Sequence, residues 1–238
     1  SSTVRRFASI PYLAMSVTAQ DLKTLEQMPE VTSIQEDKAV PATLAYSVPF
    51  IGGNTAWNSG YTGAGQAVAV LDTGVEKAHP LLTDKVVAEA CYSTTDKTYE
   101  STSVCPNGAS SSIAAGSGAP CTGTDDCSHG THVAGIVAGN GGPNNAPAGV
   151  AKGANIIAMQ VFSKFSTEGA CGVGRAPCAL TFGSDQIAAL EQVYAWRNTH
   201  TIAAVNMSLG GGQYFNQASC DTENASVKAA IDNLRAVG

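Results

Sequence analysis

The sequence predicts an α/β fold with a doubly wound, mostly parallel sheet, preceded by part of a small α+β domain. The main evidence is that segments typical of buried strands alternate with amphipathic helices from Gln66 onward. A stretch with two prolines and no helical period, residues 38–50, separates this region from a shorter pattern of strand, helix and strand. With 238 residues, 44% of them hydrophobic, the chain can bury one large domain and a small one.

The elements expected in the small domain lie between residues 12 and 37. An apolar strand at 12–17 is followed by a helix that Thr18 and Asp21 cap and Pro29 ends. Alternating residues at 31–35 predict a second strand. Residues 38–50 are then expected to form an extended linker.

The large domain is expected to begin with the wholly apolar run 67–71, which is typical of a strand buried on both faces of a parallel sheet. A helix at 129–139 would bury the face formed by Val133, Ile136 and Val137. Further elements follow in alternation: a strand at 155–161, a helix at 184–196, a strand at 201–209 and a helix near 227–234 that stops at Gly238. The pattern ends where another strand is due.

Charge and cysteine content narrow the class of protein. The net charge is −6, only 13% of residues are charged and no Lys/Arg run occurs, so we expect neither nucleic acid nor a membrane as partner. Seven cysteines in Ser/Gly/Thr/Pro-rich loops predict disulfides and secretion into an extracellular or periplasmic space. Close spacing suggests three pairs and leaves Cys220 over, although spacing does not fix connectivity: Cys91 with Cys105, Cys121 with Cys127, and Cys171 with Cys178.

A histidine at the start of the helix at 129–139 is the best candidate for a general base. Ser128 is a suitable N-cap, so His129 would open the helix. The first buried strand runs into Asp72-Thr-Gly, and strand carboxyl ends form the active-site edge of such sheets, so Asp72 is the expected partner of His129. An aspartic protease would need a second Asp-Thr-Gly loop, and a zinc site would need ligand spacings that are absent.

A third motif, Val205-Asn-Met-Ser-Leu-Gly-Gly-Gly212, ends a strand in glycines that leave main-chain groups open to an extended peptide. Alone, the motif fits a strand followed by a flexible turn better than it fits a substrate site. Taken with Asp72-Thr-Gly and His129-Gly-Thr-His-Val-Ala-Gly135, it resembles the subtilisin family of serine proteases, the subtilases of peptidase family S8. The resemblance implies that Asp72 and His129 are catalytic, and that Ser208, Leu209 and Gly210 line the S1 pocket and pair with the substrate backbone.

Residues 1–44 resemble the C-terminal part of the family's inhibitory prodomain, and 45–238 the N-terminal part of the peptidase domain. The comparison implies self-cleavage between Leu44 and Ala45. It also implies that the prodomain is an intramolecular inhibitor and folding aid. A plain N-terminal extension is the alternative for this segment.

The family's nucleophile motif, of the Gly-Thr-Ser-Met-Ala type, and its oxyanion-hole Asn do not occur in the sequence. We therefore expect a fragment, truncated at both ends, of a secreted serine endopeptidase precursor. The fragment would be monomeric and inactive alone, and its partners would be protein or peptide substrates. The alternative is a non-catalytic peptide-binding or inhibitory scaffold.

The expected chemistry requires no cofactor and no catalytic metal. Structural calcium is common in subtilases, but the resemblance places Leu81 and Tyr46 where the usual site has oxygen ligands. Asn140, Asn144 and Asn145 remain as candidate oxygen donors.

Overall fold

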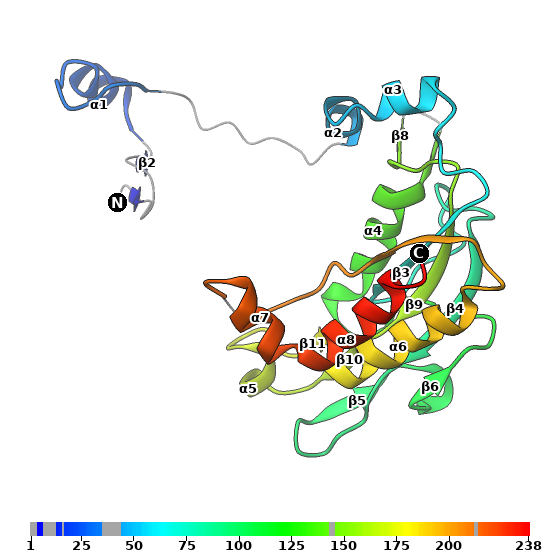
Figure 1. Cartoon of the computed structure of the whole chain (residues 1–238). Coiled ribbons are helices and arrows are strands. Elements are labelled where there is room, and N and C mark those ends of the chain that lie inside the picture. Colours follow the sequence, from blue (N-terminus) through cyan, green and yellow to red (C-terminus); the bar gives the residue numbers. More distant parts are fainter. Residues whose placement is uncertain (1–3, 7–12, 16, 35–43, 143–145, 212–213) are drawn as a thin grey trace. The chain divides into compact units, whose positions relative to one another are not determined.

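The structure is a computed structural model that describes the chain except for residues 1–3, 7–12, 16, 35–43, 143–145 and 212–213 (Figure 1). The chain divides into two units, Ser1–Ala42 and Thr43–Gly238, each of which is described by itself. Within the described residues, no helix combines the length and the apolar character that crossing a membrane requires.

The described residues of the smaller unit form one antiparallel pair of strands and one helix. Strand β1 (Val4–Arg6) pairs with β2 (Leu13–Met15), and helix α1 spans Ala19–Leu25. The predicted capping pair is confirmed, because Thr18 Oγ1 accepts from Asp21 N and the Asp21 carboxylate accepts from Thr18 N. The strand predicted at 31–35 is wrong for residues 31–34, which are irregular, and Gln35 lies outside the described residues.

The linker prediction is wrong in its second half. Helix α2 (Leu44–Phe50) occupies part of it even though Pro49 lies inside the helix, while residues 38–43 fall outside the described residues. The reason is tertiary. Val48 is buried against Gly53 at the start of α3 (Gly53–Asn58), and this packing outweighs the weak local helix signal.

The larger unit is built on a five-stranded sheet with the order β12-β3-β9-β4-β6. Its first four strands are parallel and the last is antiparallel. The strands are β12 (Ile202–Asn206), β3 (Ala67–Asp72), β9 (Asn155–Gln160), β4 (Val86–Tyr92) and β6 (Ser111–Ser112). The sequence pattern did not predict β4, and the strand predicted at 201–209 ends at Asn206.

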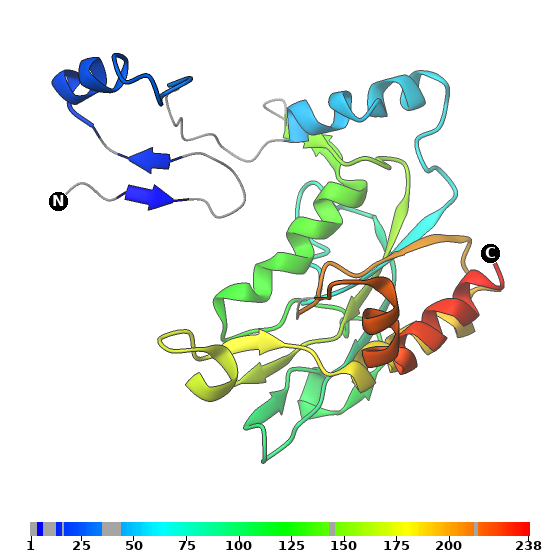
Figure 2. The same cartoon turned by 60° about the vertical axis from the view of Figure 1, so that its left-hand side comes forward.

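Helices cover both faces of the sheet (Figure 1, Figure 2). Val68 and Val70 of β3 pack toward α4 (His129–Ala138), whereas Ala69 and Leu71 pack toward α6 (Gly183–Trp196). Helix α8 (Ala225–Arg235) packs on α6, and α7 (Gln217–Glu223) precedes it. Because strand side chains alternate between faces, a strand covered on both sides must be apolar throughout. The doubly wound α/β prediction is confirmed.

A second, three-stranded sheet lies among the cysteine-rich insertions, in the order β11-β10-β5. Its strands are β5 (Ser101–Ser103), β10 (Ser163–Phe165) and β11 (Cys178–Leu180). All three suggested disulfides form, and Cys220 is the free cysteine. Shorter elements complete the unit: η1 (Pro106–Gly108), η2 (Asp125–Ser128), α5 (Glu168–Cys171) and the pair β7 (Asn140–Gly142) and β8 (Ala146–Ala148).

Candidate active site

Asp72 is the last residue of β3 and is fully buried at the carboxyl edge of the sheet. One carboxylate oxygen, Oδ1, accepts the Thr73 N–H at 2.7 Å and lies 2.7 Å from His129 Nδ1. The other oxygen, Oδ2, is buried with no hydrogen-bond partner among the described residues. Burying a carboxylate costs free energy unless the carboxylate is paired, so the hydrogen bond to His129 stabilises the buried Asp72.

His129 is the first residue of α4, and its side chain is 48% exposed while that of Asp72 is 0% exposed. Because a carboxylate only accepts, the proton of the shared hydrogen bond belongs to Nδ1. The other ring nitrogen, Nε2, is then the one with a free lone pair, on a ring that solvent can reach. An imidazole held in this tautomer can take a proton and return it.

The expected N-cap at Ser128 is only half right. Ser128 does precede the helix, but it has helical backbone angles and makes no capping hydrogen bond with its side chain. The cause is η2, a 3-10 turn that runs directly into α4. The capping hydrogen bond comes instead from a residue distant in the sequence, because Thr73 Oγ1, just after β3, accepts the Gly130 N–H at 3.0 Å. Apart from the threonine of Asp-Thr-Gly, no local sequence signal predicts this cap.

Two glycines allow the strand end and the helix start to approach each other. A Cβ on Gly130 would lie 3.1 Å from both Cβ and Oδ1 of Asp72, and closer still to the Gly74 carbonyl oxygen. Gly74 has a φ of +93°, in the region that favours glycine, and it packs against the backbone of Ala119. The short distance between Asp72 and His129 therefore requires residues without side chains at positions 74 and 130.

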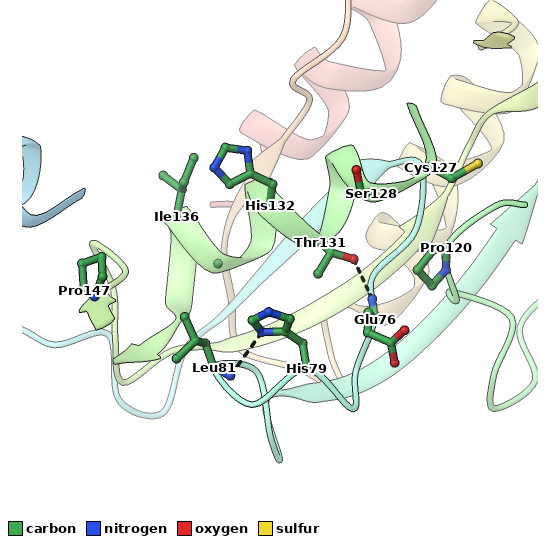
Figure 3. Close-up of a pocket in the computed structure, with 11 residues that line it drawn as sticks. Glu76, His79, Leu81, Pro120, Cys127, Ser128, Thr131, His132, Ile136 and Pro147 are labelled. Carbon is green, nitrogen blue, oxygen red and sulfur yellow. Dashed lines mark hydrogen bonds between the residues drawn. The ribbon is translucent and has the colours of Figure 1, made fainter. Parts of the chain in front are cut away.

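The buried stripe of α4 differs from the predicted one. Gly130, Val133, Ala134 and Ala138 are buried against the sheet, whereas Ile136 is only half-buried. Figure 3 shows Ile136 beside a pocket on the outer side of the helix. The buried face of α4 consists mainly of small residues because the helix packs closely on β3 and β9.

The third motif leaves the sheet at the same edge as Asp72. Strand β12 is parallel to β3 and pairs Asn206 with Val70, two residues before Asp72. Beyond Asn206 the chain is irregular, with Ser208 and Gly210 exposed and Leu209 packed against the core. The Asn206 side-chain amide donates to Ser208 Oγ at 2.9 Å. This arrangement leaves the backbone near Ser208 and Gly210 open to a ligand.

The family model for the subtilases matches residues 63–238, which include all of these residues. The chain belongs to the subtilase family. A thermostable alkaline protease of Halalkalibacterium halodurans is 28% identical over 87% of the chain and 45% of its own length. An alkaline protease of Alkalihalobacillus alcalophilus is 30% identical over 87% of the chain and 43% of its own length.

Two further similarities extend the comparison. The minor extracellular protease Vpr of Bacillus subtilis is 39% identical over 58% of the chain and 15% of its own length. A solved structure, the S41 psychrophilic protease, has a TM-score of 0.45 and 27% identity, covering 72% of this chain and 42% of that one. The chain thus spans less than half the length of these relatives.

Three other expectations concern this subtilase chain. No cluster of three or more His, Cys, Asp or Glu residues suited to a metal occurs in the described part. The Asn140 amide donates to Thr83 O at 3.3 Å, and Asn144 and Asn145 lie outside the described residues, so calcium binding stays a prediction. The expected cleavage site, Leu44 and Ala45, falls in the first turn of α2, where only the backbone is described.

Proposed function

We propose that this chain carries two members of an Asp-His-Ser triad and forms part of a secreted serine endopeptidase precursor. The observation that carries the proposal is the 2.7 Å contact between the buried Asp72 and the exposed, helix-opening His129. Membership of the subtilase family supports the assignment of a serine as the third member. Ser208, Leu209 and Gly210 are proposed to bind the substrate backbone.

In the proposed reaction, Asp72 keeps the proton on His129 Nδ1, so Nε2 accepts the proton of the serine hydroxyl. The serine oxygen then attacks the carbonyl carbon of the peptide bond, and the imidazolium that forms is stabilised by the buried carboxylate. His129 afterwards gives the proton to the leaving amine. Electrostatic stabilisation of the oxyanion needs donors that the motifs of this chain do not supply.

Two features support secretion. Three disulfides are typical of proteins from oxidising compartments, and one relative is named an extracellular protease. We further propose that residues 1–44 are prodomain and that self-cleavage follows Leu44. Proteases bind the cleaved segment in an extended form, so the first turn of α2 must open before cleavage. N-terminal sequencing of a processed precursor tests this, and a mature start far from Ala45 would contradict it.

The test of function uses two forms of the protein. The 238-residue chain should show no measurable turnover of peptide substrates, because loss of the serine alone costs about 10⁶-fold in a subtilase. A longer precursor should hydrolyse them, and Asp72→Asn should lower kcat by about 10⁴-fold without unfolding the protein. Full activity of Asp72→Asn would refute the role of Asp72. A longer precursor that binds peptides without cleaving them would favour a binding or inhibitory scaffold.

A further inference from the structure

A pocket of about 540 Å³ lies on the outer side of α4 (Figure 3) and has no part in the proposed triad. We call it the α4 pocket. Its walls are largely apolar side chains from four separate segments: Leu81, Pro120, Ile136 and Pro147. Its size is within the range of ligand pockets. Apolar walls of this kind suit a chain of methylene groups.

The polar side chains of the α4 pocket are the Glu76 carboxylate, the imidazoles of His79 and His132, and the hydroxyls of Ser128 and Thr131. Among the described residues, no lysine or arginine lines it. The neighbouring Lys77 does not neutralise Glu76, because its ammonium group pairs with the buried carboxylate of Glu89 at 2.7 Å. Glu76 therefore supplies a negative charge that no lysine or arginine of the described lining offsets.

The start of α4 would otherwise favour an anion, because a helix N-terminus presents unpaired N–H groups. In α4 the first two of these N–H groups already have acceptors. The His129 N–H donates to Asp126 O within η2, and the Gly130 N–H donates to Thr73 Oγ1. An anion in the pocket would lack these donors and would meet the charge of Glu76. The charge of the lining thus selects a cation.

We propose that the α4 pocket binds the long basic side chain of a polypeptide, arginine or lysine. The aliphatic stem lies along Leu81, Ile136 and Pro147, and the charged head reaches the carboxylate of Glu76. His132, which lines the pocket, is one helical turn from His129. The identification of the bound polypeptide as a substrate rests on the proposed function. The proposal that the pocket binds a basic side chain does not depend on it.

Nuclear magnetic resonance of the imidazole C–H signals tests the proposal on the 238-residue chain, which has only four histidines. The probes are n-butylguanidinium, its neutral isostere n-butylurea, and butyrate. We expect n-butylguanidinium to shift the His79 and His132 signals saturably, with n-butylurea about fivefold weaker, as for one exposed ionic contact. Glu76→Gln should remove the preference for the cation. Glu191→Gln, the same change at an exposed site on α6, should leave it intact.

The apolar wall is tested by Ile136→Ser, which should weaken binding of both butyl probes while the protein keeps its amide spectrum. Equal binding of n-butylguanidinium and n-butylurea, tighter binding of butyrate, or no saturable shift would each overturn the proposal. An unchanged preference in Glu76→Gln would do the same. None of these measurements involves peptide hydrolysis, so failure here leaves the triad proposal standing, and failure of the triad proposal leaves this one standing.

Discussion

Replacing Gly130 with alanine perturbs the closest approach between the strand and the helix of the candidate site. The new Cβ would lie 3.1 Å from two atoms of Asp72 and nearer still to the Gly74 carbonyl oxygen. The obstructing backbone has little room to retreat. Cys121 N–H bonds Thr73 O at 2.9 Å, and Val75 N–H bonds Gly118 O at 2.8 Å on either side of Gly74.

The magnitude follows from two opposing terms. Overpacking of a tight site costs about 1–3 kcal/mol, and immovable backbone places this site toward the upper end. Replacing a helical glycine by alanine returns up to about 1 kcal/mol, and less in the first turn. We expect a net loss of about 2 kcal/mol in the free energy of unfolding, or a melting temperature lower by about 4–8 °C for a chain of this size.

Gly135→Ala is the matched control, because it lies in the same helix and its new Cβ would meet nothing within 4 Å. It should be neutral or stabilising by up to about 1 kcal/mol. Thermal unfolding followed by circular dichroism measures both variants. The His129 Nδ1 proton resonance should shift in Gly130→Ala only. If Gly130→Ala proved as stable as Gly135→Ala, the close-approach argument would be refuted.

Three further predictions concern other parts of the larger unit. Burial raises the pKa of Asp185, so its carboxylate destabilises the fold above that pKa. Asp185→Asn should therefore add about 1 kcal/mol to the free energy of unfolding at pH 7 and nothing below about pH 3.9. Thermal unfolding measured across this pH range would contradict the prediction if it showed the opposite trend. Removing the bridge with Cys91→Ala and Cys105→Ala should cost about 3 kcal/mol in urea unfolding, because it closes a loop with a sequence separation of 14, whereas Cys220→Ala should change little. Thr73→Val should cost about 1–3 kcal/mol by leaving the capped N–H of α4 unpaired, and Thr73→Ser, which keeps the hydroxyl, should recover most of it; equal stability of the two would argue against the cap.

Features that depend on short stretches of sequence were predictable. The apolar run of β3 requires burial on both faces wherever it sits, and it places Asp72 at a strand end. The capping pair of Thr18 and Asp21 is local, as are the short cysteine spacings that proved to be disulfides. These contacts join residues close in the chain, so propensity and spacing describe them.

Features decided by distant partners were not predictable. Residues 31–34 have strand propensity but pair with no strand among the described residues, whereas β4 has a neighbouring strand on each side. The cap of α4 comes from Thr73 rather than Ser128, and Ile136 turns to a pocket because small residues pack closer to the sheet. The sequence alone determined which residues could perform proton transfer. The tertiary structure decided how they meet, since the contact of Asp72 with His129 spans 57 residues and depends on two glycines that let the backbones approach.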